Sequence, residues 1–599
     1  MATAKKTKKT RAATKRVASI SEQTLGRPFR GTGYMLVGLD KPQAQFVISA
    51  DKAGQELANA VFILDSDVVP HHGLRYLAEG ESMTLSFSSI ASLVMQPSGP
   101  ALPILRELAQ RVNEAVQARR VMLDRILQED QPIAFDFLPE ALSAFCGKTI
   151  VITDSNGCRR GVRLDRVRQQ RGWGGEFVEF AYETLLWENG RVVPMQGTYN
   201  IYHGDPKRLA EYGISLTVSP DEREQLAARG RRVVALNSSC AYVHLQDGIE
   251  TRAWLRWERD PRSGRGIVDQ SGASTFAPEL RQHDFEGGLR DVRAVTNPDQ
   301  RLTDDDMFRV DPYLMVFSFI SKAWGRAHVD KVADIRFRMD AFERLVMPER
   351  DKRLVFTLVK NTDPSMVTDI VDDKGGGCSL LLHGKPGRGK TLTAEAVAEV
   401  LKRPLYVVSV GELGTDPKTL EESLYRVLLT AHRWNAVLLL DEADVFLERR
   451  SAGDVNRNAM VSTFLRLLEY YNGVLILTTN RVTTMDEAFF SRMSLALHYR
   501  DFEEGARAAV VRNLLDANGV RLSDSEIDEI ATSDANGRQI KSAIRLSRFL
   551  AREENRAVSA GDIMMLLDRV HEFERAMREG RGDADDALLS SPLTDSVAE

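Results

Sequence analysis

The stretch Cys378–Leu401, CSLLLHGKPGRGKTLTAEAVAEVL, decides the fold of the surrounding chain. Its apolar run Ser379–Leu382 predicts a buried strand, and the alanine-rich segment after Lys390 predicts a helix. Glycines between them let backbone N–H groups curl around phosphate oxygens, which also lie at the positive end of the following helix. The stretch therefore predicts a phosphate-binding P-loop between a strand and a helix.

This loop predicts a bound nucleoside triphosphate whose phosphates share Mg²⁺ with the protein. Lys390 supplies positive charge to the phosphates, and the Thr391 hydroxyl is a Mg²⁺ ligand. The predicted nucleotide-binding set of the loop is Gly384, Lys385, Pro386, Gly387, Arg388, Gly389, Lys390, Thr391 and Leu392.

Two further apolar runs, Val437–Leu440 and Val474–Leu477, end in polar residues. The carboxyl ends of parallel strands meet at one edge of an α/β sheet, so these residues should lie beside the P-loop. Asp441 is predicted to hold Mg²⁺ through its water shell, and Glu442 to activate the attacking water as general base. Asn480 is predicted to position that water.

The order of motifs resembles the AAA subgroup of the AAA+ ATPases. The motifs are the P-loop, DEAD (Asp441–Asp444), TTN (Thr478–Asn480) and DEAFFSR (Asp486–Arg492). Long phrases such as LLLDEADVFLERR and RNAMVSTFLRLLEYYNGVLILTTNR extend the likeness, over about 311–556, to single-module AAA ATPases of filamentous fungi with a β-rich N-terminal region. The resemblance implies an ATP hydrolase with a P-loop NTPase parallel sheet and a small α-helical lid, assembled as a homo-oligomeric, hexameric ring.

The resemblance also implies two arginine roles. Arg492 falls where such proteins supply an arginine finger to a neighbouring subunit; its alternative is a surface ion pair, because the usual two-arginine spacing is shortened to SR. Arg538, which opens the helix RQIKSAIRLSRFLA, resembles a sensor arginine that reaches the γ-phosphate, and its alternative is an exposed arginine without a role. After LYVVSV, by contrast, the segment from Gly411 to Leu424 has no pore-loop aromatic, which argues against threading of unfolded polypeptide.

The rest of the chain divides by pattern. Alternating runs such as YMLVGL, NAVFIL and MTLSFSSIASLVM predict strands in the N-terminal region, as do KTIVITD and RRVVALN further on. The predicted organisation is a disordered basic tail (1–30), a small β-rich domain (31–100), an amphipathic helix (101–130), a β-rich or α+β partner-binding region (131–310), a helical or mixed lead-in (311–372), the AAA core (373–500), an α-helical lid (501–572) and a disordered acidic tail (573–599). The amphipathic helix is read as packing on its own domain, with a coiled coil as the alternative.

Composition excludes several classes of protein. With 599 residues, 43% hydrophobic and 28% charged, the chain is long enough for about three or four globular domains. No apolar run reaches the roughly 18 residues that a membrane span needs, and no apolar segment follows the N-terminal lysines. Four widely spaced cysteines fit a reduced compartment, so we expect a cytoplasmic protein without membrane contact.

The expected function is coupling of ATP hydrolysis to remodelling of a folded complex that contains an unidentified protein partner. The alternative is a nucleic-acid-associated ATPase recruited through the basic tail or through Trp254 and Trp257, which lie among arginines. The net charge of -5 gives no overall support for nucleic acid. A nucleotide-gated scaffold is disfavoured because Glu442 is present.

Overall fold

The computed structural model describes residues 27–589, apart from 28, 42, 66–67, 70, 95–102, 155–156, 173–174, 189, 254–255, 281–289, 292–301, 363–376, 415, 448–454 and 482–486. Most of the predicted basic tail, Trp254, Asp486 and the last ten residues lie outside this range. The chain forms two compact units: Met1–Ser239 with Ala273–Met315 and His328–Asp330, and Cys240–Gly272 with Val316–Ala327 and Lys331–Glu599. None of the helices in the described ranges combines the length and apolar character needed to cross a bilayer.

The first unit begins with a small α+β domain. The prediction of a β-rich domain over 31–100 is therefore wrong in part. NAVFIL belongs to a helix, because Asp51 caps its first turn by accepting from the backbone N–H of Gly54 at 2.7 Å, and Leu57 and Val61 are buried one turn apart. MTLSFSSIASLVM divides into a strand and a helix. The elements are β1 (Phe29–Gly31), β2 (Tyr34–Val37), β3 (Gln45–Ile48) and β4 (Met83–Ser86), antiparallel in that order, with α3 (Lys52–Leu64), α4 (His71–Ala78) and α5 (Phe87–Val94).

The predicted amphipathic helix is confirmed as α6 (Pro103–Gln128). Its residues Leu105, Leu108 and Val112 are buried in the core of the small α+β domain. This burial favours packing on its own domain over a coiled coil. Arg119, which interrupts the apolar seam, is buried, and its Nε donates to Glu140 at 2.7 Å.

A second, larger sheet completes the first unit. RRVVALN was predicted to be a strand but lies in α8 (Pro220–Ser238), whose N-cap Ser219 accepts from the backbone N–H of Glu222. The strands, in the sheet order β14-β8-β7-β6-β5-β9, are β14 (Arg290–Asp291), β8 (Arg191–Tyr202), β7 (Gly175–Glu188), β6 (Arg159–Gly172), β5 (Thr149–Thr153) and β9 (Ile214–Ser215), accompanied by α7 (Leu138–Ser143) and α10 (Asp304–Phe308).

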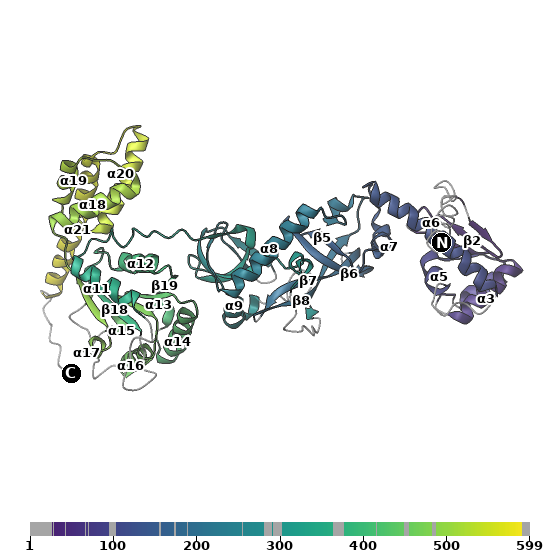
Figure 1. Ribbon diagram of the computed structural model, residues 1–599, viewed down its shortest axis with the longest axis horizontal. Coiled ribbons are helices and arrows are strands. Elements are labelled where there is room, and N and C mark those ends of the chain that lie inside the picture. The colour runs from purple at the N-terminus through teal and green to yellow at the C-terminus, as the bar shows by residue number, and fades with distance from the viewer. Residues whose placement is uncertain are drawn as a thin grey trace, which may run out of the picture. The chain divides into compact units, whose positions relative to one another are not determined.

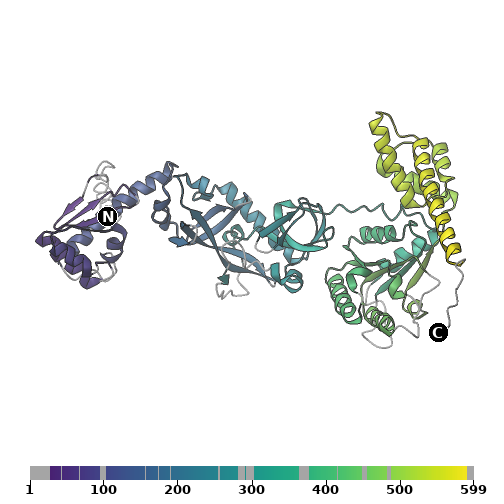
Figure 2. The ribbon, with the colours of Figure 1, turned by 180° about the vertical axis from the view of Figure 1, so that it is seen from behind.

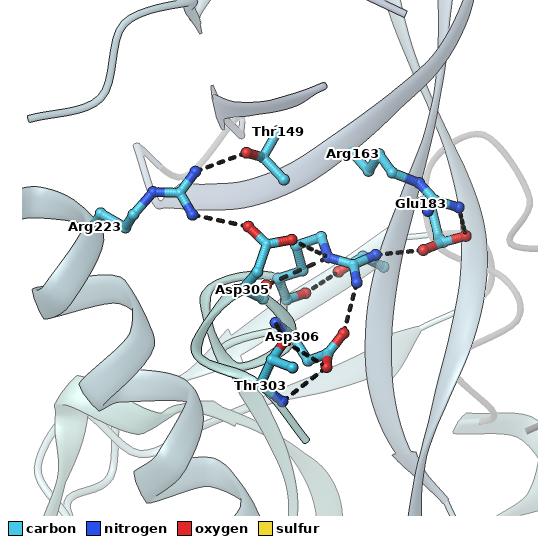
Figure 3. Close-up of polar contacts among 9 residues, drawn as sticks. Thr149, Arg163, Glu183, Arg223, Thr303, Asp305 and Asp306 are labelled. Carbon is cyan, nitrogen blue, oxygen red and sulfur yellow. Dashed lines mark hydrogen bonds and ion pairs between the residues drawn. The ribbon is translucent and has the colours of Figure 1, made fainter. Parts of the chain in front are cut away.

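An acidic segment, residues 303–311, is wedged between this sheet and α8 (Figure 3). Gly161 and Gly230 make room for it. A Cβ on Gly161 would lie 2.4 Å from the backbone oxygen of Phe308, and a Cβ on Gly230 would lie 2.0 Å from that of Met307. Arg309 is buried, donates to Glu183 and pairs with Asp306 at 2.7 Å. Ion pairs and close backbone packing therefore fasten the segment to the sheet.

The second unit begins with a seven-stranded sheet that curls on itself (Figure 1). The region predicted as a helical or mixed lead-in (311–372) supplies three strands of this sheet before its helix α11 (Glu349–Lys360). In sheet order they are β12 (Arg256–Asp260), β11 (Ile249–Ala253), β16 (Ala323–His328), β15 (Tyr313–Ser318), β13 (Gly264–Val268), β10 (Tyr242–Leu245) and β17 (Val332–Asp334), with α9 (Gln270–Phe276) after β13. We call this the curled sheet.

The predicted parallel sheet is confirmed, with the strand order β19-β20-β21-β18-β22. Leu380 and Leu382 pack on the face covered by α11 and α12, whereas Leu381 packs on the face covered by α14 and α16 (Figure 1). The strands are β18 (Cys378–Gly384), β19 (Leu405–Ser409), β20 (Val437–Asp441), β21 (Val474–Thr479) and β22 (Leu495–Tyr499). The helices are α11 (Glu349–Lys360), α12 (Lys390–Leu401), α13 (Val410–Leu413), α14 (Pro417–Arg433), α15 (Asp444–Leu447), α16 (Val455–Glu469) and α17 (Glu487–Phe490).

Four helices follow as the lid, gathered in one bundle (Figure 2). They are α18 (Glu504–Asn518), α19 (Asp524–Ala531), α20 (Gly537–Glu553) and α21 (Ala560–Leu589). The prediction of a disordered tail from residue 573 is wrong as far as Leu589, because α21 continues to that residue. Its low apolar content hid this extension in the sequence.

We expect Arg309→Ala to loosen the wedged segment by about 3 kcal/mol, since Asp306 loses its cation and Glu183 keeps only its more exposed partner Arg163. Arg231→Ala is the matched control. Arg231 pairs with Asp304 at the surface of the same segment, and its loss should cost under about 1 kcal/mol. Hydrogen exchange of β7 peptides in the full chain measures both changes, and equal protection in the two variants would contradict the expectation.

Candidate nucleotide site

The phosphate loop lies between β18 and α12, and its shape requires glycine. Gly389, directly before the helix, has φ +96°, and Gly387 has φ +76°, both in the left-handed region. A Cβ on Gly384 would lie 2.4 Å from the backbone oxygen of Tyr499 on β22. The loop is therefore held close to the neighbouring strand, with its backbone folded toward the start of α12.

Lys390 ties the loop to the central strands. Its Nζ donates to the backbone oxygens of Gly384 (2.7 Å) and Lys385 (2.9 Å) and to Asn480 Oδ1 (2.8 Å). Burial is the largest influence on the Lys390 amine and lowers its pKa, as does Arg538, while Asp441 and Asp444 act in the opposite direction. An ammonium held among backbone oxygens is available to phosphate oxygens, which are stronger acceptors.

Two oxygen ligands suited to Mg²⁺ lie side by side at the same edge. Thr391 Oγ1 is 3.4 Å from both carboxylate oxygens of Asp441. A hydroxyl and a carboxylate fit the oxygen preference of Mg²⁺, which usually takes one or two protein ligands beside substrate phosphates and water. These two residues are the ones that would hold the ion.

Glu442 follows Asp441 in a left-handed conformation, with φ +56°. Glu442 is exposed, and its backbone N–H donates to Thr478 Oγ1 at 2.9 Å. Asn480, at the end of the neighbouring strand, donates its backbone N–H to Asp444 Oδ1 at 2.9 Å, while its side-chain oxygen accepts from Lys390. The structure thus brings together Lys390, Thr391, Asp441, Glu442 and Asn480.

The lid contacts the loop directly. The backbone N–H of Gly537 donates to the Gly387 oxygen at 3.0 Å, and Asn536 caps α20 by accepting from the N–H groups of Arg538 and Gln539. The side chain of Arg538 is exposed beside this junction. Leu392, the last residue of the predicted loop set, is 55% exposed.

The loop's two remaining basic residues join the start of the lid. Lys385 Nζ and Arg388 Nη2 contact the two carboxylate oxygens of Asp501, at 2.8 Å and 2.9 Å. Arg388 is buried, and its guanidinium lies 5.2 Å from the ring centre of Phe502. Their side chains therefore connect the loop to the lid, a role that the sequence motif did not indicate.

Arg492 lies at the opposite end of β18 from the loop. Its backbone oxygen accepts from Ser379 Oγ at 2.9 Å, and its Nη1 donates to the Ala488 oxygen at 3.0 Å. Ser379 and Gly384 are five residues apart on one strand, about 16 Å. Arg492 therefore does not join the phosphate site of its own chain.

The curled sheet packs on the AAA core through aromatic rings. Phe317 and Trp434 have ring centres 5.1 Å apart, and Phe319 and Tyr406 lie 6.2 Å apart. Asp269, which is 2% exposed, accepts from Trp434 Nε1 at 2.8 Å and from Arg433 at 2.7 Å.

The segment after β19, where a threading ring would carry its pore loop, also contacts the curled sheet. Lys322, at the turn between β15 and β16, donates to Glu412 at 2.5 Å. Partial burial would raise the pKa of Glu412, but Lys322 and Ser409 outweigh it and hold that pKa below its usual value. The acidic loop residue is thus engaged within its own chain.

Trp257, singled out for nucleic acid, has a packing role. Arg326 lies over its ring, 4.2 Å from the ring centre, and pairs with Glu250 at 2.6 Å. Arg262 and Arg265, from the same basic segment, pair with Asp260 and Glu399. Trp257, Arg262 and Arg265 thus have partners within the chain, whereas Trp254 lies outside the described residues.

Residues 380–500 match the ATPase family associated with various cellular activities (AAA). These residues form an AAA domain, as the motifs predicted. The nucleotide site described above lies largely within this domain.

Many known proteins are similar to part of this chain, among them the following three. Spastin of Naegleria gruberi is 28% identical over 182 residues, which is 28% of this chain and 35% of spastin. Fidgetin-like protein 1 of Xenopus laevis is 26% identical over 268 residues, covering 43% of this chain and 39% of the relative. A putative 26S proteasome regulatory subunit homolog of Methanothermobacter thermautotrophicus is 28% identical over 204 residues, covering 32% of this chain and 54% of the relative. The chain thus spans about a third to a half of the length of these relatives.

One solved structure, a complex of E. coli HORMA, CdnC and Trip13, contains a chain that aligns at 18% identity. The alignment covers 38% of this chain and 85% of that chain, with a TM-score of 0.28. This score is too low to support a comparison.

A histidine pair beside the loop predicts a pH dependence. His383, the second-last residue of strand β18, stacks on His498 of β22 with ring centres 4.7 Å apart. Burial, then His498 and Lys390, lower the pKa of His383. As the pH falls below about 6.5, the unfolded chain gains a proton that the folded state resists, so the free energy of unfolding should decrease.

We expect His383→Phe, which keeps a ring for stacking, to reduce the loss of stability between pH 7.5 and pH 5.5. His432→Gln, at an exposed histidine of α14, is the control. Urea midpoints of the full chain at both pH values give the measurement. An unchanged difference between the two midpoints in His383→Phe would exclude this histidine as the source.

Proposed function

We propose that this protein hydrolyses ATP in a ring of identical subunits and uses the cycle to rearrange a folded protein partner. The observation that carries the ATPase proposal is the contact of Lys390 with both the phosphate loop and Asn480. It brings the loop's cation and the end of β21 to one point, beside Asp441 and Glu442.

In the proposed reaction, the oxygen of a water molecule attacks the γ-phosphorus and its proton passes to Glu442. The bond to the bridging oxygen breaks, so ADP and inorganic phosphate leave. Asn480 orients the water, and Lys390 holds the phosphate oxygens. Mg²⁺, when bound by Thr391 and Asp441, supplies charge that stabilises the transferred phosphoryl group.

The distance of Arg492 from its own phosphate loop supports the proposed ring. Arg492 lies about 16 Å along β18 from its own loop. In the proposed ring its guanidinium instead reaches the γ-phosphate bound by a neighbouring subunit and stabilises the transition state. Arg538, beside the junction of loop and lid, is proposed to contact the γ-phosphate of its own chain.

Rearrangement of a folded partner is favoured over threading by the contact between Lys322 and Glu412. A threading ring needs its loop after β19 free to grip an extended chain, mostly through aromatic and apolar contacts. Here that loop is acidic and bound to the curled sheet. Nucleotide-dependent movement of the loop would therefore pass to the N-terminal segments of the same chain.

Glu442→Gln should retain nucleotide binding and lose about 100-fold or more in turnover, because only the general base is removed. Lys390→Ala should lose nucleotide affinity. Glu422→Gln, on the exposed side of α14, is the matched control and should hydrolyse at the parent rate. Binding of a fluorescent ATP analogue and phosphate release measure the two properties separately, and parent turnover in Glu442→Gln would refute the assignment.

The full chain, supplied with ATP, should leave a fluorescent protein folded when that protein carries a permanently unfolded tag. Hydrogen exchange of the β15–β16 turn should instead differ between ADP and a non-hydrolysable ATP analogue. Lys322→Glu should reduce this difference by repulsion from Glu412, and adding Glu412→Lys should restore it. ATP-dependent loss of fluorescence that stops in Glu442→Gln would show threading and reject this part of the proposal.

A further inference from the structure

Thr478 lies on β21, the strand between β18, which leads into the phosphate loop, and β20, which ends in the acidic motif. It pairs with Leu382 of β18, two residues before the loop, and β20 with its acidic end lies on the other side of β21. The residue is 1% exposed. A hydroxyl so buried must find partners in the protein.

Three consecutive residues of the acidic motif depend on Thr478. Its Oγ1 donates to Asp441 Oδ1 at 2.5 Å and accepts from the backbone N–H of Glu442 at 2.9 Å. Its backbone oxygen accepts from the N–H of Ala443, also at 2.9 Å. The single hydroxyl is thus used both as donor and as acceptor.

These bonds act on two different groups. The bond to Asp441 Oδ1 holds the rotation of a carboxylate whose two oxygens both lie 3.4 Å from Thr391 Oγ1. The bonds from Glu442 and Ala443 hold the chain where Glu442 has φ +56°, a conformation that costs a residue with a Cβ free energy and persists only when its surroundings fix it. Without the hydroxyl, the N–H of Glu442 loses its acceptor.

We propose that Thr478 is a positioning residue for ATP hydrolysis, whose hydroxyl orients Asp441 toward Mg²⁺ and Glu442 toward the attacking water. The inference rests on the proposed function, and it assigns Thr478 a role that the TTN motif alone did not indicate. Groups that orient a metal ligand through hydrogen bonds typically change metal affinity or activity by about 10- to 100-fold when removed.

Thr478→Val tests this in the full chain, because valine keeps the shape and the strand preference of threonine and removes only the hydroxyl. With a non-hydrolysable ATP analogue bound, the dissociation constant of Mn²⁺, followed by electron paramagnetic resonance, should rise about 10-fold or more. The kcat for ATP should fall about 10- to 100-fold. The affinity for the analogue in EDTA should stay unchanged, since the loop is intact.

Thr478→Ser keeps the hydroxyl and should restore Mn²⁺ affinity and kcat. Thr430→Val is the matched control: Thr430 is also buried, but its hydroxyl donates only to the Arg426 oxygen within α14. Where Thr478→Val fails to fold, Thr478→Ala gives the same comparison with a smaller side chain.

Parent Mn²⁺ affinity and kcat in Thr478→Val would overturn the inference, as would equal losses in the serine and valine variants, which would indicate packing instead. An unmodified protein that binds Mn²⁺ and the analogue but hydrolyses no ATP would refute the proposed function. The Mn²⁺ comparison would still decide the role of Thr478.

Discussion

The ammonium of Lys390 is the point on which the nucleotide site depends. It satisfies two backbone oxygens of the phosphate loop and the side chain of Asn480, so it closes the loop and fixes the end of β21 in one set of bonds. Glycines at the loop make that closure sterically possible, and the buried strands on both sides keep the ends of β18 and β21 in register. A cation among three oxygens also leaves a place that phosphate oxygens can take over.

The AAA core contacts two neighbouring parts of the chain, the lid and the curled sheet. Toward the C-terminus, Gly387, Lys385 and Arg388 connect the loop to the lid through Gly537 and Asp501. Toward the N-terminus, the AAA core contacts the curled sheet through Trp434, Tyr406 and Glu412. A change in the phosphate loop's partners therefore has a direct route to the lid through Gly537 and Asp501. The curled sheet is joined to the same core through Trp434 and Glu412.

The sequence was most informative where local pattern and tertiary role agree. Buried parallel strands leave uninterrupted apolar runs, so β18, β20 and β21 were predictable, and the polar residues after them followed from sheet geometry. NAVFIL and RRVVALN were misread because β-branched and aromatic residues favour strands locally, whereas Asp51 and Ser219 cap helices that tertiary packing then stabilises. Thr478 was missed because the sequence shows that a hydroxyl is present but gives no indication of which neighbouring strand it bonds.

Asp269 shows that the packing of the AAA core extends beyond the residues matched by the family. The family match starts at residue 380, yet this buried carboxylate, more than a hundred residues upstream, holds Trp434 Nε1 and Arg433 of the core. Phe317 and Phe319 cover the same tryptophan. A fragment cut at the family boundary would present Trp434 and Tyr406 to water, and exposed aromatic surface of this kind promotes association. A fragment that keeps the packing of the AAA core should therefore include the curled sheet, whose first strand, β10, begins at Tyr242.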